Sequence, residues 1–386
     1  MTGLLKSVMR EHADSATPPL PDLDAIVTAG DRRTRRTRMA AGVGVAAVVA
    51  AAVAVPGALS LDRATDAPVA STQDAARGAY AERLPTYSLG SVIHYGDTTV
   101  DVHDQVASFV QTDDGFVYAT KNGEVHFADG RTTEKIGRTS TDGLYLKADD
   151  TGSTVAWVEF PDGEAPEFVV YDTARRAEVL RTSQGNTAGM TSFRDTDAAY
   201  IFGVDGDDVY WRSGDGLVRY DLQTGESEVL SADANPFDVA DIANGHIAHQ
   251  IEGVDGEDLP LRVSTDLEHP GKPLPSGWDG FLSPDATYIA VDKADEMAVY
   301  DVATHEDVSP STEGYAFAAA YTWLDDRTVM MIGMERPDKS ETIDVLRCPV
   351  PSGACEVVAD DVATYEDDSA VSDLGLLSLP VGEEIR

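Results

Sequence analysis

The chain of 386 residues carries 68 acidic and 29 basic side chains, a formal net charge of −39 at pH 7. Its 42% hydrophobic and 25% charged residues are typical of a globular protein. Because so negative a surface repels phosphate backbones, the composition argues against nucleic-acid binding by the large C-terminal part. We interpret the acidic excess as a solubility feature, with recognition of a specific cationic ligand as the alternative.

Residues 1–38 predict a short basic tail. Five of its arginines lie in the segment Arg32–Arg38, directly before an uncharged stretch. The segment GLLKSVMREHAD has apolar residues at helical spacing, and Pro18, Pro19 and Pro21 end it. We expect one or two short helices here.

Residues 39–61 predict a transmembrane helix. The 23 residues MAAGVGVAAVVAAAVAVPGALSL hold no charge and have roughly the length that a helix needs to cross a bilayer. Because positive charge stays on the cytoplasmic side, the tail is expected inside and everything after Leu61 outside, in a single-pass plasma-membrane protein. A cleaved signal peptide is the alternative, since Ala58-Leu59-Ser60 resembles a cleavage site. Both interpretations export the C-terminal part.

The rest of the chain predicts a linker and then an all-β domain. Residues 62–88 show no sustained apolar pattern, so we expect a flexible tether there. From residue 89 to 386, short apolar runs alternate with turns such as Asp113-Asp114-Gly115 and Lys121-Asn122-Gly123. This pattern is typical of many antiparallel strands.

The expected strands also recur in one phrase: an apolar strand, a tyrosine and aspartate, a turn with Thr-Gly character, and a second apolar strand. Clear copies lie at Val169–Val179, Val218–Val229 and Ala298–Val308, and looser ones at Val125–Gly130, Arg262–Asp266 and Val345–Cys348. The markers Phe127, Tyr171, Tyr220, Val263, Tyr300 and Arg347 are 44, 49, 43, 37 and 47 residues apart. A period of about 40–50 residues indicates the blades of a β-propeller.

The markers account for six blades. The hairpin Ser91–Val102 precedes the first of them, and Ala370–Val381 supplies one or two strands after the last. A blade built from both ends of the domain would close the ring and remove its exposed sheet edges. We therefore predict seven blades, with six as the alternative.

The only two cysteines, Cys348 and Cys355, flank a segment with Pro351, Ser352 and Gly353. Their number and spacing fit neither a zinc site nor a Cys-x-x-Cys redox motif. We expect a disulfide across a β-hairpin, which requires an oxidising compartment. Two buried thiols are the alternative.

The segments Leu282–Val291 and Ala298–Thr304 resemble the repeat of TolB-like and WD-repeat-like propellers, in which a Ser-Pro-Asp-Gly turn opens a strand and a Tyr-Asp hairpin closes the blade. Here Ala286 stands in place of the turn glycine. The resemblance covers about residues 89–381 and implies a propeller.

The whole layout resembles a group of actinobacterial membrane proteins with a short tail, one Ala/Val-rich span and an exported propeller. Some similar proteins are thought to work beside extracytoplasmic-function sigma factors, so the resemblance implies a regulatory role for the tail. A zinc-binding anti-sigma domain would need His and Cys ligands, whereas residues 1–38 contain only His12 and no cysteine.

The search for chemistry gave no catalytic, cofactor or metal site. The chain has no Gly-x-Ser-x-Gly motif of the hydrolases that attach to propellers. His246 and His249 are three apart, so a strand would point them to opposite faces. The turns Asp205–Asp208 and Asp255–Asp258 lack the spacing of a calcium loop, and Asp and Gly are ordinary turn residues. The tryptophans Trp157, Trp211, Trp278 and Trp323 are expected to pack blades, with a ligand cage as the alternative.

These observations predict a membrane-anchored extracytoplasmic β-propeller that binds or senses a protein, peptide or envelope ligand and is not an enzyme. One alternative is regulation of a sigma factor or another cytoplasmic partner through the tail. A second alternative is an exported propeller hydrolase or lyase. The fold alone does not decide among them, because propellers serve unrelated functions.

Overall fold

The computed structural model describes residues 78–141, 145–191, 198–232, 239–250, 260–277, 279–293, 296–335, 341–365 and 376–383. The expected tail, the expected transmembrane helix at 39–61, residues 62–77 of the expected linker and Trp278 lie outside these ranges. Within the described ranges, no helix combines the length and apolar character that crossing a bilayer demands.

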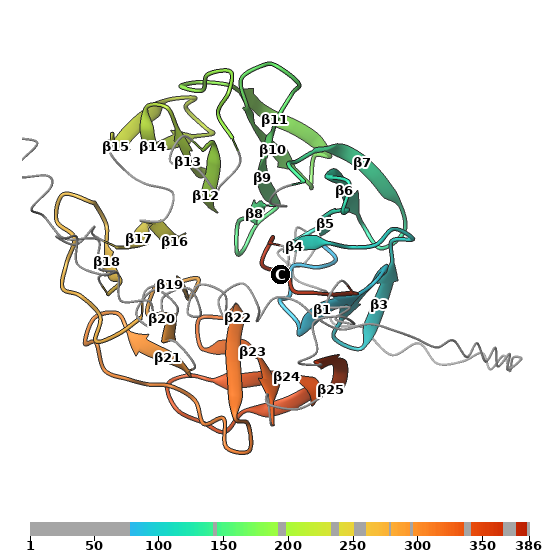
Figure 1. The fold of residues 1–386 in the computed structure, drawn as a ribbon, viewed down its shortest axis with the longest axis vertical. Coiled ribbons are helices and arrows are strands. Elements are labelled where there is room, and N and C mark those ends of the chain that lie inside the picture. Colours follow the sequence, from blue (N-terminus) through green and yellow to red (C-terminus); the bar gives the residue numbers. More distant parts are fainter. Residues whose placement is uncertain are drawn as a thin grey trace, which may run out of the picture. The chain divides into compact units, whose positions relative to one another are not determined.

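The described residues form 26 strands in seven antiparallel sheets, which surround a common centre with one strand of each sheet innermost (Figure 1). The sheets with four strands, in order from the innermost strand outward, are β26 (Leu377–Ser378), β1 (Thr86–Leu89), β2 (Val92–Tyr95) and β3 (Thr98–Asp101) in blade 1; β4 (Ser108–Thr112), β5 (Gly115–Ala119), β6 (Glu124–Ala128) and β7 (Thr133–Arg138) in blade 2; β8 (Leu146–Ala148), β9 (Thr154–Glu159), β10 (Glu167–Asp172) and β11 (Ala177–Thr182) in blade 3; β12 (Tyr200–Asp205), β13 (Asp208–Ser213), β14 (Gly216–Asp221) and β15 (Ser227–Ser231) in blade 4; and β22 (Phe317–Asp325), β23 (Thr328–Met334), β24 (Glu341–Pro349) and β25 (Glu356–Tyr365) in blade 7. The sheets with three described strands are β16 (Val239–Ala243), β17 (His246–His249) and β18 (Arg262–Ser264) in blade 5, and β19 (Asp279–Leu282), β20 (Tyr288–Lys293) and β21 (Glu296–Asp301) in blade 6.

The sheets follow one another around the ring in chain order. The innermost strands β4, β8, β12, β16 and β19 contact in sequence, and β21 contacts β22. Blade 7 meets blade 1 where the Tyr321 hydroxyl donates to the Thr86 carbonyl at 3.4 Å. The domain is therefore a seven-bladed β-propeller.

The predicted seventh blade is confirmed, and the six-bladed alternative is wrong. The C-terminal strand β26 pairs with β1, Leu377 facing Leu89 and Ser378 facing Ser88. The expected hairpin within Ser91–Val102 supplies β2 and β3. Both ends of the domain thus complete one blade, and each of the other six contains one of the repeat markers.

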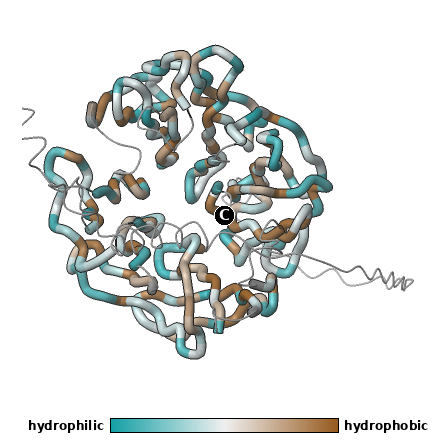
Figure 2. Tube along the Cα trace, viewed as in Figure 1, coloured by the Kyte–Doolittle hydropathy of each residue, from teal (hydrophilic) through white to brown (hydrophobic). Residues whose placement is uncertain are grey.

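The core lies between neighbouring blades. Trp157 and Trp211 are completely buried, and Trp211 stacks on Phe168 with ring centroids 4.7 Å apart. Trp323 is 7% exposed and packs between blades 6 and 7. Figure 2 shows apolar residues concentrated along strands and hydrophilic residues in the turns. The three described tryptophans therefore pack blades against one another, as the sequence predicted.

The start of the propeller differs from the expected boundary at residue 89. Tyr80 packs edge-on against Tyr95 and Phe116, at 5.1 and 4.9 Å between ring centroids. Strand β1 begins at Thr86, inside the expected linker. Residues 78–88 thus belong to the propeller, because they are held by long-range contacts that no local sequence pattern announces.

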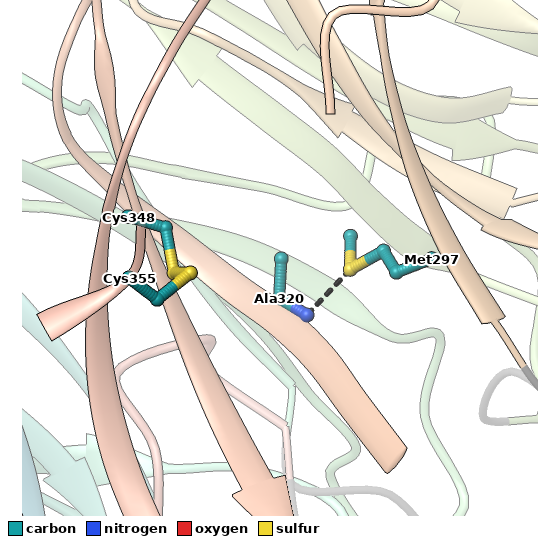
Figure 3. Close-up of a disulfide and its surroundings, with 4 residues drawn as sticks. All are labelled: Met297, Ala320, Cys348 and Cys355. Atoms are coloured by element: carbon teal, nitrogen blue, oxygen red, sulfur yellow. Dashed lines mark hydrogen bonds between the residues drawn. A yellow bond between two sulfur atoms is a disulfide. The ribbon is translucent and has the colours of Figure 1, made fainter. Parts of the chain in front are cut away.

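Cys348 and Cys355 form a disulfide with a sulfur–sulfur distance of 2.08 Å (Figure 3). Cys348 lies in β24, and Cys355 directly precedes β25. The bond closes the turn between these two strands of blade 7. Cys348 is fully buried in a cluster that includes Trp323 and Met331.

Candidate functional site

Aspartates gather in the turns that join the first and second strands of blades 2 to 7. Because the first strands run side by side around the ring, these turns share one face, here called the inner-turn face. It carries Asp113, Asp114, Asp149, Asp150, Asp205, Asp207, Asp208, Asp285, Asp325 and Asp326. This concentration makes the inner-turn face a candidate for ligand binding, so we asked what each carboxylate contacts.

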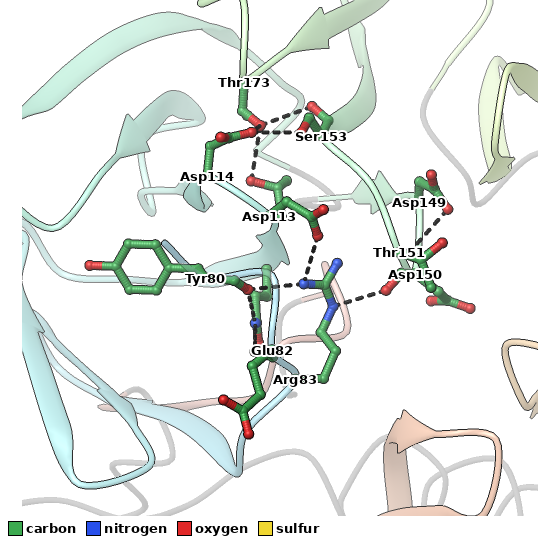
Figure 4. A network of polar contacts seen from close by, with 12 residues as sticks. Tyr80, Glu82, Arg83, Asp113, Asp114, Asp149, Asp150, Thr151, Ser153 and Thr173 are labelled. Carbon is green, nitrogen blue, oxygen red and sulfur yellow. Dashed lines mark hydrogen bonds and ion pairs between the residues drawn. The ribbon is translucent and has the colours of Figure 1, made fainter. Parts of the chain in front are cut away.

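The turns of blades 2 and 3 are joined through Asp113 and Asp114 (Figure 4). The Asp113 amide donates to the Gly152 carbonyl at 2.9 Å. The Asp114 carboxylate accepts from the hydroxyl of Ser153 at 2.6 Å and of Thr173 at 3.3 Å. The Asp114 carboxylate of blade 2 is thus used to hold blade 3.

The same device continues from blade 3 to blade 5. The Asp149 carboxylate accepts a hydrogen bond from the Gly206 amide in the next turn. The Asp205 carboxylate accepts from the Gly245 amide at 2.6 Å, which joins blades 4 and 5. In both cases the acceptor is a carboxylate and the donor a turn amide of the following blade.

The series extends to blade 7. The Asn244 side-chain amide donates to the Asp285 carbonyl at 3.0 Å, and the Asp285 amide donates to the Asp326 carboxylate. Polar contacts therefore join consecutive blades from 2 to 7 along this face. The acidic turns hold the ring together, and this accounts for much of their aspartate content.

The N-terminal brace, residues 78–85, fastens to the same face. The Arg83 guanidinium forms an ion pair with Asp113 at 3.1 Å and donates to the Asp150 carbonyl at 2.9 Å. The Gln111 side-chain amide donates to the carbonyls of Tyr80 and Glu82 at 2.8 and 2.9 Å. Figure 4 shows Arg83 between these turns, so the brace joins the turns of blades 2 and 3.

The sequence had raised Asp205–Asp208 and the His246–His249 pair as metal ligands. Asp205 is occupied by Gly245, and Asp207 accepts from the Gln223 side chain. In β17, His249 is 3% exposed whereas His246 lies near the surface. The described residues contain no group of three or more His, Cys, Asp or Glu side chains that could hold a metal ion. The turn Asp255–Asp258 lies outside the described residues.

A second group of charges, the axial cluster, lies on the innermost strands: Lys147, Asp150, Asp241, Asp279 and Glu383. The Lys147 ammonium forms an ion pair with Glu383 at 3.1 Å. Asp241 of β16 accepts from the Leu282 amide at 2.8 Å, which ties blade 5 to blade 6. The cluster brings together residues from blades 3, 5 and 6 and from the C-terminus.

The axial cluster titrates close to neutral pH. Loss of hydration, and then repulsion from Asp241 and Asp149, raises the pKa of Asp150 to about 7. Loss of hydration also raises the pKa of Asp241 and of Asp279 to about 6. Burial alone would lower the pKa of Lys147, but Glu383 and Asp241 outweigh it and raise that pKa. The charge of this cluster therefore changes between pH 5 and 8.

Sequence reasoning missed both groups. Lys147 and Glu383 are 236 residues apart, and the turn aspartates resemble ordinary turn residues in any single blade. The one available signal was the recurrence of Asp pairs after the expected first strands, which becomes informative only when the blades are placed side by side.

No family model and no curated protein sequence matches the chain. Among solved structures, the computationally designed protein Ika8 is 12% identical, with 75% of this chain and 95% of that chain covered and a TM-score of 0.44. TolB from Acinetobacter baumannii is 15% identical, with 70% and 64% covered and a TM-score of 0.35. A chain of the mitotic checkpoint complex is 11% identical, with 78% and 90% covered and a TM-score of 0.45.

Proposed function

We propose that this chain is a membrane-anchored, extracytoplasmic binding or sensing module that recognises a protein, peptide or envelope ligand without catalysing a reaction. The observation that carries the proposal is the closed seven-bladed ring, an architecture that commonly serves as a scaffold for protein binding. The uncharged stretch 39–61, preceded by five arginines, supports the anchor. The Cys348–Cys355 disulfide supports the external location, since disulfides persist in oxidising compartments.

The location is tested by trapping thiols in intact cells. The chain has two cysteines, so a maleimide polymer added after acid quenching reports them without background from other sites. We expect no mass shift before reduction and a double shift after it. Double labelling without reduction would show two free thiols and contradict the external location.

Ligand binding is tested with photoreactive residues in the full-length chain. Asn122 and Arg175 are exposed turn residues on opposite faces of the ring, in the β5–β6 and β10–β11 turns. We expect one of these positions to capture a defined partner that excess unlabelled chain competes away. Capture that competition does not reduce, or no capture from either face, would contradict a binding role.

A further inference from the structure

The chain continues beyond the strand that closes the ring. We call residues 376–383 the C-terminal strap. The Ser378 hydroxyl of β26 donates to the carbonyls of Val106 and Ala107, at 3.2 and 3.0 Å. Both carbonyls precede β4, so the strap has already reached blade 2 at the end of its own strand.

The last described residues then cross to blade 3. The Gly382 amide donates to the Phe109 carbonyl of β4 at 2.9 Å, and the Gly382 carbonyl accepts from the Leu146 amide of β8 at 2.8 Å. The adjacent Glu383 pairs with Lys147 at 3.1 Å. Three successive blades are thus joined by one short segment near the ring centre (Figure 1).

Apolar contacts seat the other end of the strap. Leu377 and Leu379 are 3% and 5% exposed, and they pack with Met330 and Ile343 of blade 7. Burial of two leucine side chains favours the seated strap by about 3–6 kcal/mol before the entropy of ordering is subtracted. The strap therefore contacts blades 7, 1, 2 and 3.

Only glycine fits at position 382. Its φ is +72°, and a Cβ there would lie 1.8 Å from the Leu146 carbonyl oxygen and 2.9 Å from a Val110 methyl. No small adjustment removes a clash with a backbone atom at this distance. Seating of the strap is thus sensitive to a single methyl group.

We propose that the C-terminal strap is a conformational lock that fastens the ring across blades 1 to 3 and keeps Lys147 paired within the axial cluster. When the strap leaves, the inner ends of β4 and β8 lose their hydrogen-bond partners, and Lys147 becomes available to a carboxylate from another molecule. Glu383 is then an internal occupant that such an acidic ligand would replace. This device goes beyond the proposed binding role and does not depend on it.

The test compares Gly382→Ala with Gly163→Ala in the full-length chain. Gly163 has φ +74° and no atom within 4 Å of an added Cβ, so it carries the same backbone strain without the clash. Hydrogen exchange is followed in peptides covering β4 and β8. We expect Gly382→Ala to speed exchange of the Leu146 amide about tenfold, and Gly163→Ala to leave it at the wild-type rate.

Acylation of lysines gives a second measurement on the same samples. Lys147 should react several-fold faster in Gly382→Ala, with Lys135, which pairs with Glu124 at a distance from the strap, as the internal reference. Equal exchange and equal Lys147 labelling in the two glycine variants would overturn the lock.

If Gly382→Ala does not fold, Glu383→Gln leaves the backbone unchanged and removes only the ion pair. The pKa of Lys147 then falls, so a larger fraction of the amine is neutral and reactive. We expect faster acylation of Lys147 relative to Lys135. An unchanged ratio would show that Glu383 does not hold Lys147 and would also overturn the proposal.

Discussion

At the scale of single residues, the turn aspartates are joints between blades. Each of Asp114, Asp149 and Asp205 accepts a hydrogen bond from the next blade along the chain. A sequence shows that an aspartate lies in a turn, but the donor is at least 39 residues away and belongs to another turn. The structural use of these acids was therefore beyond prediction from local patterns.

Replacement of Asp205 by alanine should destabilise the propeller. The change leaves the Gly245 amide without its carboxylate acceptor, and we expect the free energy of unfolding to fall by about 1 kcal/mol. Urea titration measures the loss. Asp162→Ala is the control, because it removes the same charge from an exposed turn. If both variants are equally stable, the inter-blade bond contributes nothing.

At the scale of elements, the repeat phrase identified one strand of six blades. Phe127, Tyr171, Tyr220, Val263, Tyr300 and Arg347 all lie in the third strand of their sheet. The phrase was visible because the third strand, its turn and the following segment are contiguous and follow local turn chemistry. The innermost strands were not, because strands such as β8, with three residues, are defined by their neighbours in space.

The hairpin between β24 and β25 should depend on its disulfide. Replacing both Cys348 and Cys355 by alanine restores the entropy of the open loop in the unfolded chain, so we expect a loss of about 2 kcal/mol in the free energy of unfolding. Chemical denaturation of the oxidised wild type and the double variant measures it. Reduced wild-type protein should match the double variant; a reduced protein as stable as the oxidised one would refute the prediction.

At the scale of the whole molecule, the excess of acid makes stability depend on pH. The raised pKa values of Asp150, Asp241 and Asp279 mean that the folded protein binds more protons than the unfolded chain between about pH 4 and 7. These three groups therefore make the protein more stable as the pH falls from 8 to about 5.

We expect the melting temperature to be higher at pH 5.5 than at pH 8, measured at constant ionic strength. Other aspartates act in the opposite direction at lower pH. Backbone amides of their own turns lower the pKa of Asp101 and Asp221, so their contribution is lost only when the pH falls below about 4.

Asp150→Asn supplies the control for this pH dependence. Asparagine does not titrate, so the difference in melting temperature between pH 8 and 5.5 should be smaller than in wild type. A wild-type melting temperature that is flat or falls on acidification over this range would show that the axial carboxyls do not govern stability.

Closure by the C-terminal strap also fixes when the ring can be completed. Strand β1 begins at Thr86, but the strand that covers its inner edge is Leu377–Ser378, close to the end of the chain. During synthesis, blades 2 to 7 can form while blade 1 still exposes an unpaired edge. This edge can recruit strands from other chains until the last residues emerge. For this protein, the most aggregation-prone interval in biogenesis is therefore the one just before synthesis ends.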